Sequence, residues 1–368
     1  MKIATFNIQN LFHRHTELLQ ETHSKNSGDW VAQLDSLLRK QPKSQGDNER
    51  IHELTFLLGF DSTQNLPYAL LKNKGGDLFF KKQGILSETK ASFLSDWEGW
   101  VKLMNRPLHE KAIFSKAYVI AETDPDILVL QEVEDRSSLL EFNAEFLPLL
   151  KISPYEEVMV FETNDQRGLG MGVMLKNGFR MCSLRSYLNE RDSEGFNLFD
   201  LDCQEYEIAM PRGERVHILS NHFSSDSRQR KEQAEWVAAR YREMLTEGKK
   251  NILICGALND VSYSDCLSPL LRETELSDIA RHDRFKTDTD KGRGGGYFRL
   301  GAYRMGVNIK QKDYLLLPPG LSEKVRSAGM NRKGTWLNRK PNWSLYPSIA
   351  SKHHAASEHP LVWARIHV

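Results

Sequence analysis

The residues that could do chemistry stand at the ends of short apolar runs. Four of them are Asn7, Glu132, His222 and Asn259. Each run has the length and composition of a buried strand. Because open α/β sheets carry their chemistry outside the carboxyl ends of their strands, we expect these four side chains to converge at one edge of a sheet.

Hard oxygen ligands for a divalent cation are among these residues. Asn7, Glu132 and Glu358 supply the amide and carboxylate oxygens that Mg²⁺ or Mn²⁺ prefers. Such an ion polarises a phosphoryl group and stabilises a leaving oxygen. Taken singly, Asn7 also suits a turn and Glu132 a salt bridge at a sheet edge, so only the combination points to a metal site.

A second group would act on the phosphate itself. His359, if oriented by the acid Asp313, can hold or protonate a phosphate oxygen. Asn259 would position the attacking water or the phosphate. A histidine in a strand is usually structural, but His222 lies between polar residues, as at the mouth of a site.

The stretch NILICGALND, residues 251–260, organises the rest. Asn251–Cys255 is a nearly continuous apolar run that breaks at Gly256. With this glycine before it and Asn259 two residues after it, position 257 is where a carboxylate is expected. The sequence has Ala257 there.

Several elements must position these residues. Helices are predicted over Leu108–Glu122, which stops before Asp124-Pro125, and over Arg228–Leu245. Residues 13–106 form an insertion that we expect to be mostly helical, from the spacing in Trp30–Arg39, Arg50–Phe60 and Ala91–Met104. Strands are predicted at Lys2–Phe6, Asp126–Leu130, Val158–Glu162, Gly172–Leu175, Arg215–Phe223, Asn251–Cys255, Asp313–Leu317 and Leu361–Val368.

Composition sets outer limits. The 368 residues suit one large α/β domain or a domain with an insertion, and a net charge of +1 gives no global field for a polyanion. The four cysteines lack metal-binding spacing and are expected to be reduced thiols. Since there is no apolar leader and no long apolar span, we expect a cytoplasmic protein that does not bind membranes.

A nucleic-acid substrate is suggested by basic residues interleaved with aromatic ones over Leu321–Trp343, and by Arg228–Lys231. Single strands suit this combination, and we expect DNA in preference to RNA. The alternative interpretation of the first stretch is a solvated loop. The candidate substrate-binding residues are Arg167, Asn221, Arg332 and Trp336.

The order of the motifs FNIQNL, LVLQEVE, SNHFSS, CGALND, KDYLLL and SEHPLV resembles the endonuclease/exonuclease/phosphatase superfamily, the deoxyribonuclease I-like proteins. The resemblance implies a four-layer α-β-β-α sandwich of two mixed sheets, formed as one domain over residues 1–368. It implies that Asn7 and Glu132 bind the metal and that His222 contacts the scissile phosphate. It also pairs Asp313 with His359 and places a water-activating aspartate at position 257.

The sequence departs from the family pattern at two positions. The usual Ser-Asp-His is Ser-Glu-His, so Glu358 keeps the charge on a longer arm. Ala257 removes a general base, which is typically worth about 10²–10⁴ in rate. We therefore expect an inactivated variant of a Mg²⁺-dependent nuclease. The alternatives are a phosphatase or phosphodiesterase acting on a small phosphoester or phosphoinositide, and a binding protein without catalysis.

Overall fold

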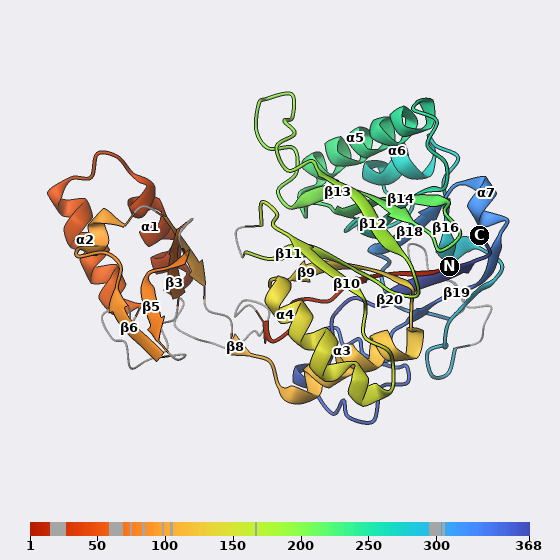
Figure 1. The fold of residues 1–368 in the computed structure, drawn as a ribbon, viewed down its shortest axis with the longest axis horizontal. Coiled ribbons are helices and arrows are strands. Elements are labelled where there is room, and N and C mark those ends of the chain that lie inside the picture. Colours follow the sequence, from red (N-terminus) through yellow and green to blue (C-terminus); the bar gives the residue numbers. More distant parts are fainter. Residues whose placement is uncertain are drawn as a thin grey trace. The chain divides into compact units, whose positions relative to one another are not determined.

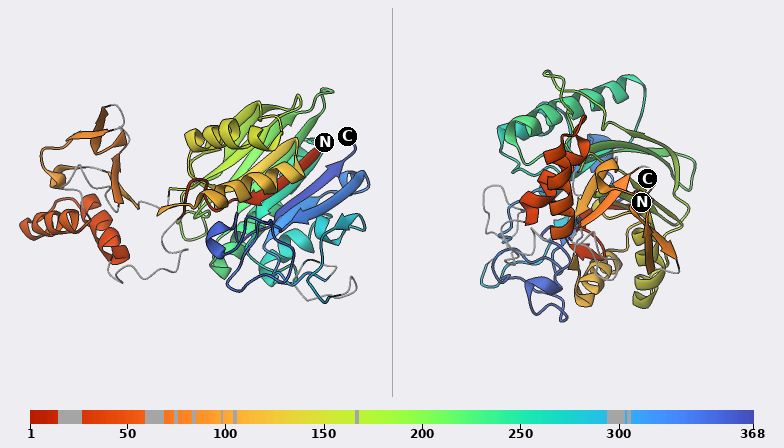
Figure 2. Two further views of the ribbon diagram at one scale, coloured as in Figure 1. Left: turned by 90° about the horizontal axis from the view of Figure 1, so that it is seen from below. Right: turned by 90° about the vertical axis from the view of Figure 1, so that its left-hand side faces the viewer.

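The computed structural model describes residues 1–14, 27–58, 69–73, 76–82, 85–97, 99–103, 106–165, 168–293, 303 and 306–368. The chain divides into two compact units (Figures 1 and 2). The larger unit contains Met1–Phe12 and Leu108–Val368, and the smaller one contains His13–Pro107. None of the helices in these described ranges combines the length and the apolar composition needed to cross a bilayer.

Two mixed sheets form the larger unit. The first has the order β10 (Glu157–Phe161), β11 (Gly170–Leu175), β9 (Ile127–Val133), β1 (Lys2–Asn7), β20 (Leu361–Ile366), β19 (Val325–Asn331) and β17 (Phe285–Lys286). The second has the order β12 (Arg180–Ser186), β13 (Asp202–Ala209), β14 (Arg215–His222), β15 (Ile252–Ala257), β18 (Asp313–Leu317) and β16 (Ser277–Asp278). The pairs β1–β9 and β14–β15 are parallel, whereas β1–β20 and β15–β18 are antiparallel.

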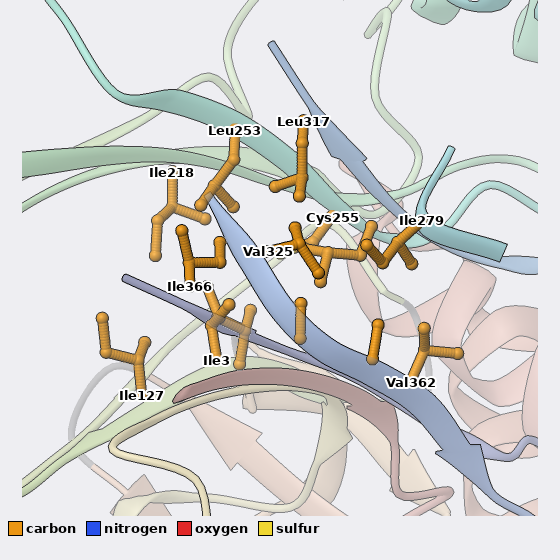
Figure 3. Packing of buried hydrophobic residues seen from close by; sticks show 14 of the residues in the cluster. Ile3, Ile127, Ile218, Leu253, Cys255, Ile279, Leu317, Val325, Val362 and Ile366 are labelled. Carbon is orange, nitrogen blue, oxygen red and sulfur yellow. The ribbon is translucent and has the colours of Figure 1, made fainter. Parts of the chain in front are cut away.

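The main hydrophobic core lies between the two sheets. Ile3 and Ile127 of the first sheet pack toward Ile218 and Leu253 of the second (Figure 3). These positions follow the period-2 alternation of strands. Every second residue of β14 and β15 therefore faces the first sheet, and the residues between them face helices.

Helices cover the outer faces. α3 (Glu110–Thr123) and α4 (Arg136–Glu141) pack on the first sheet through residues such as Ile120 and Leu139. α5 (Ser227–Thr246) covers the second sheet through Val237 and Tyr241, together with the short α6 (Ser268–Leu271). The layers are thus α-β-β-α (Figure 1). This confirms the predicted fold class.

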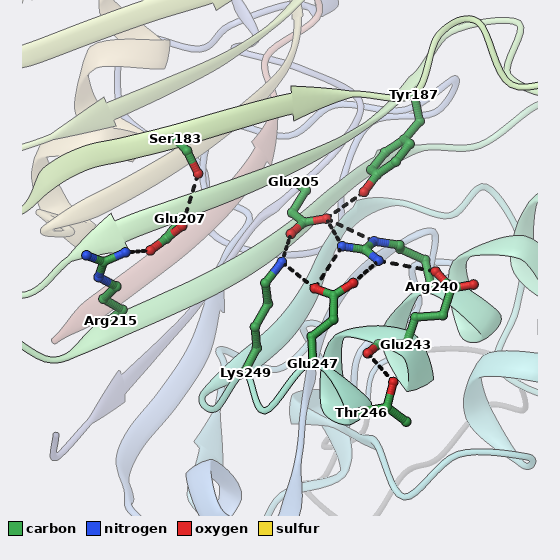
Figure 4. Close-up of polar contacts among 10 residues, drawn as sticks. All are labelled: Ser183, Tyr187, Glu205, Glu207, Arg215, Arg240, Glu243, Thr246, Glu247 and Lys249. Atoms are coloured by element: carbon green, nitrogen blue, oxygen red, sulfur yellow. Dashed lines mark hydrogen bonds and ion pairs between the residues drawn. The ribbon is translucent and has the colours of Figure 1, made fainter.

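An ion-pair network fastens α5 to the outer face of β13 (Figure 4). The carboxylate of Glu205 accepts hydrogen bonds from Arg240 Nε at 3.0 Å, Lys249 Nζ at 2.6 Å and the Tyr187 hydroxyl at 2.5 Å. Glu247 pairs with Arg240 at 2.7 Å. Because these cations are neutralised by carboxylates, this face of α5 is not an anion-binding surface.

The smaller unit has its own core and mixes helices with strands. Two helices, α1 (Ser27–Arg39) and α2 (Gln45–Leu57), bury Leu34 and Leu54 together with Leu71. Its strands are β3 (Ala69–Asn73), β4 (Gly76–Asp77), β5 (Phe79–Lys82), β6 (Ile85–Thr89) and β7 (Trp100–Leu103), and its two ends pair as β2 (His13–Arg14) with β8 (Arg106–Pro107).

The expectation of a mostly helical insertion was wrong in this respect. No α-helix is found among the described residues of Ala91–Met104, where β7 instead pairs with β3. Trp97 is buried, but Trp100 on β7 is 40% exposed. A short apolar run suits either a helix or a strand, and here the pairing partner decides the outcome.

Candidate active site

A row of four residues crosses the second sheet where β14 and β15 end. Asp202 pairs with His222, His222 with Ala257, and Ala257 with Asp313. Directly paired residues have side chains on the same face of a sheet. That face is turned toward the first sheet, since His222 has the same parity as Ile218. The central stretch of the sequence therefore places Ala257 between a histidine and an aspartate.

Glu132 reaches this row from the first sheet because of a β-bulge. In the pairing of β9 with β11, Gln131 lies opposite Met171 and Val133 lies opposite Gly170, so Glu132 is the extra residue. Its φ of 57° is left-handed, which is uncommon for a residue with a Cβ atom. Glu132 Oε1 lies 3.8 Å from His222 Nε2. The bulge thus brings the two sheets' polar residues together.

The left-handed backbone at Glu132 gives a stability prediction. Glycine avoids the cost of roughly 1–2 kcal/mol that a Cβ atom adds in this conformation. Both Glu132→Gly and Glu132→Ala lose the carboxylate, but we expect the glycine variant to be the more stable by about 1 kcal/mol. Urea unfolding in EDTA measures the difference. Glu207 of β13 is a strand residue without a left-handed backbone, so there the alanine variant should be the more stable. The same order of stability at both positions would contradict the argument.

His359 and Asp313 form a buried pair beside the same row. His359 Nδ1 lies 2.8 Å and 3.0 Å from the two carboxylate oxygens of Asp313. Burial lowers the pKa of His359, but the charge and hydrogen bond of Asp313, with a contribution from Glu132, raise it above its ordinary value overall. Since Nδ1 is directed to Asp313, Nε2 is the ring atom left to face a substrate.

The loops after β1 and before β20 are tied together. Ser357 Oγ donates to the carbonyl oxygen of Asn7 at 2.7 Å, and the Glu358 amide donates to Gln9 Oε1 at 2.7 Å. The backbone amide of Gln9 in turn donates to Asn7 Oδ1 at 3.1 Å. These contacts place Asn7 and Glu358 on adjacent loops.

Two residues that the sequence reasoning missed support these loops. Gln9 joins them, as described, and its signal was its place inside the FNIQNL motif. Lys116 of α3 is fully buried and donates to the carbonyl oxygens of Ile8, at 2.7 Å, and Ala356. A lysine in a helix without an acidic neighbour gave no sign of this role, because its partners are backbone atoms far away in the sequence.

Asn259 and Glu358 have contacts that define where they lie. Asn259 has a φ of 54°, and its Nδ2 donates to the carbonyl oxygen of Phe223 at 2.6 Å. It therefore holds the chain after β14 against the chain after β15. Glu358 is partly exposed, and its carboxylate lies 2.7 Å from Lys352 Nζ.

The donor set suits a hydrated Mg²⁺. The described residues contain no group of three His, Cys, Asp or Glu side chains arranged to hold an ion. Mg²⁺ does not require one, because it keeps several waters and binds through one or two carboxylates. Glu132 offers a carboxylate between the two sheets. Asn7 offers its side-chain oxygen, which accepts a hydrogen bond from the backbone amide of Gln9.

Two of the residues predicted to bind substrate lie elsewhere. Asn221 lies on the α5 face of β14, opposite to His222, and its Nδ2 donates to the carbonyl oxygen of Leu219 at 3.0 Å. Arg332 is fully buried, with Nη1 2.5 Å from Asp290 and Nε 2.9 Å from Asp288. Neither side chain belongs to the row that contains His222, Ala257 and Asp313. Strand alternation removes Asn221 from the site, and two aspartates from a distant loop neutralise Arg332.

The basic stretch Leu321–Trp343 is divided between core and surface: Arg332 and Trp343 are buried, whereas Lys324, Arg326, Arg339 and Lys340 are exposed. Its first part forms β19, and Arg332 stacks over the buried Trp343, with its guanidinium carbon 4.8 Å from the ring centroid. Trp336 is partly exposed, and its amide donates to the Ser357 carbonyl oxygen at 3.3 Å, so it lies beside Glu358. Arg228 pairs with glutamates instead of facing solvent alone. Arg167 lies outside the described residues.

Comparison with solved structures gives weak but consistent likeness of fold. The mannosyl-6-phosphatase Bt3783 of Bacteroides thetaiotaomicron VPI-5482 is 15% identical, with a TM-score of 0.49 over 70% of this chain and 90% of that chain. An endonuclease/exonuclease/phosphatase family protein of Bacteroides thetaiotaomicron is 14% identical, with a TM-score of 0.48 over 69% and 84%. The neighbours thus include the superfamily that the motifs resemble. The human Nocturnin catalytic domain with bound sulfate is 17% identical, with a TM-score of 0.45 over 70% and 86%. No protein-family model matches the chain, and the search of curated proteins gave no match.

Proposed function

We propose that this chain has the site of a Mg²⁺- or Mn²⁺-dependent phosphodiesterase acting on nucleic acid, and that Ala257 prevents turnover. The supporting observation is the convergence of Glu132 with His222 across the two sheets, beside the pair His359–Asp313. An acidic metal ligand, two imidazoles and an amide can together support phosphodiester hydrolysis. The methyl group of Ala257 lies in the row where a proton acceptor is expected.

Each side chain has a separate task in this proposal. Glu132, Asn7 and Glu358 would hold the cation, which supplies Lewis-acid polarisation of the phosphoryl group when bound. His359, protonated and held by Asp313, donates a hydrogen bond from Nε2 to a phosphate oxygen. Asn259 and His222 orient the phosphate. Because Ala257 cannot accept a proton, water in this site is not activated.

Arg332 and Trp343 are buried, so they cannot contact a nucleic-acid strand. This observation favours a second candidate function, in which the substrate is a small phosphoester. The test is a panel of substrates for the Ala257→Asp variant with Mg²⁺: supercoiled DNA, single-stranded DNA, RNA, phosphoinositide vesicles and bis(p-nitrophenyl) phosphate. Cleavage of DNA is the expected result. Turnover of only the small esters or phosphoinositides would favour the second candidate, and no turnover at all would favour a binding protein.

We propose that the smaller unit is an insertion that selects the substrate. Its ends are adjacent, since β2 pairs with β8 and the Leu108 amide donates to the Phe12 carbonyl oxygen at 2.7 Å. Among the residues that the structure describes, none from His13–Pro107 belongs to the three cores of the larger unit.

Replacing residues 13–107 by a short Gly-Ser linker tests that role. The larger unit should keep a cooperative unfolding transition, because its cores are intact. In the Ala257→Asp background, hydrolysis of bis(p-nitrophenyl) phosphate should be unchanged, while the ratio of rates on DNA and RNA changes. Unaltered rates on every substrate would remove the proposed role in selection.

A further inference from the structure

A cluster of three histidines and one lysine lies where α3 begins, with Glu110 as the acidic residue of that first turn. It consists of His109, Lys111, His353 and His354, the last two belonging to the 3₁₀ turn Lys352–His354. The rings of His109 and His354 have centroids 4.5 Å apart at an angle of 58°. Within the described ranges, none of the four has an ion pair.

The two neighbouring imidazoles present hydrogen-bond donors. His109 Nδ1 accepts the Lys111 amide proton at 3.1 Å, and His354 Nδ1 accepts the Ala350 amide proton at 3.3 Å. In the neutral rings the proton therefore resides on Nε2, which is the form that donates to an anion and does not bind a metal there. His354 has a lowered pKa, from burial first and then from the charges of His109, Lys111 and His353. The rings thus supply neutral Nε2–H donors, and Lys111 supplies the fixed positive charge.

The cluster is connected to the proposed site by a short path. Lys352 begins the 3₁₀ turn that ends at His354, and its Nζ contacts Glu358 at 2.7 Å. Glu358 adjoins His359, which would hold the scissile phosphate. The cluster is thus joined, through Lys352, to the loop that carries Glu358 and His359.

Resting on the proposed function, we propose that this cluster binds a second phosphate of a nucleic-acid strand whose scissile phosphate occupies the site. A compact phosphoester without a second phosphate would leave the cluster unused. A membrane surface fits less well, because interfacial binding needs apolar side chains beside the cations. None of the exposed large apolar residues in the described ranges belongs to 109–111 or 352–354.

The test uses the chain as given, which should bind without cutting. Fluorescence anisotropy with single-stranded DNA is measured with Mg²⁺ between 50 and 200 mM KCl. Lys111→Gln should weaken binding about threefold to tenfold and lower the salt slope by about 0.7, the value for one phosphate contact on a single strand. Lys111→Arg should restore both. The matched control is Lys250→Gln, which changes an exposed lysine just before the opposite end of β15 and should alter neither.

Two further measurements separate the possible failures. Equal salt slopes for Lys111→Gln, Lys250→Gln and the parent, or no DNA binding by the parent, would overturn the inference. So would a loss confined to phosphoinositide vesicles. In the Ala257→Asp background, Lys111→Gln should leave hydrolysis of bis(p-nitrophenyl) phosphate unchanged. If Ala257→Asp cleaves nothing while Lys111→Gln weakens DNA binding as expected, the proposed catalytic function fails but the cluster stands.

Discussion

Ala257→Asp is expected to raise Mg²⁺-dependent phosphoester hydrolysis by about 10²–10⁴-fold over the chain as given, the usual contribution of a general base. The new carboxylate would stand in the row between His222 and Asp313, on the face turned toward Glu132. There it can accept the proton of an attacking water. All the other groups of the proposed site are already present.

The same substitution should leave substrate affinity unchanged or weaken it. A carboxylate close to the scissile phosphate repels the bound phosphodiester, and Ala257 is free of that repulsion. Dissociation constants and kcat/KM are therefore measured on the same DNA, with and without Mg²⁺. Ala257→Asn is the matched control, because it has the size of aspartate without its basicity. If the aspartate variant binds DNA but is no more active than the asparagine variant, the general-base argument fails.

Asp313→Asn should destabilise the fold by about 3–5 kcal/mol at acid pH, the range for removing one partner of a buried ion pair. His359 is 9% exposed and depends on Asp313 to hold its charge. A histidine whose folded pKa is raised contributes stability below its unfolded pKa of about 6.5, and that contribution is lost as the pH rises through the folded value. The effect of the substitution should therefore shrink at alkaline pH.

Urea unfolding in EDTA at several pH values measures this, with Asp202→Asn as the control. Asp202 lies in the same row, and burial raises its pKa to about 6 despite hydrogen bonds from Gln204 and Ser186. An acid with a raised folded pKa makes the fold less stable as the pH rises from about 4 to 6. Asp202→Asn should therefore become more favourable as the pH rises from about 4 to 6, whereas the cost of Asp313→Asn should fall only above a pH of about 6.5. A pH-independent effect of Asp313→Asn would contradict an ionic role for the pair.

The strands of the larger unit were predictable where apolar runs have clear limits. Asp313–Leu317 is a strand over the predicted residues, and the strand ending at Asn7 was one residue longer than expected. Buried strands need a continuous apolar sequence, so a short segment of sequence is enough to predict them. What brings His222, Asp313 and His359 together is the pairing of distant strands. That arrangement followed from the family resemblance and not from spacing.

The errors have physical causes of the same kind. Glu132 was expected just after a strand, but β9 continues to Val133 and a bulge redirects its side chain. Arg332 was expected to bind substrate because it belongs to a stretch of basic residues interleaved with aromatic ones. Its partners Asp288 and Asp290 lie more than forty residues earlier in the chain. Bulges and long-range ion pairs leave no local signal.

The paired ends of the smaller unit also bear on the order of folding. β1 must find its parallel partner β9 across the whole intervening segment, and closing a long loop costs chain entropy. If His13–Pro107 folds first and β2 pairs with β8, the effective loop between β1 and β9 becomes roughly fivefold shorter. The free-energy cost of closing that loop then falls by about 1.4 kcal/mol. Early folding of the smaller unit would thus favour the pairing of β1 with β9 in the sheet that carries Asn7 and Glu132.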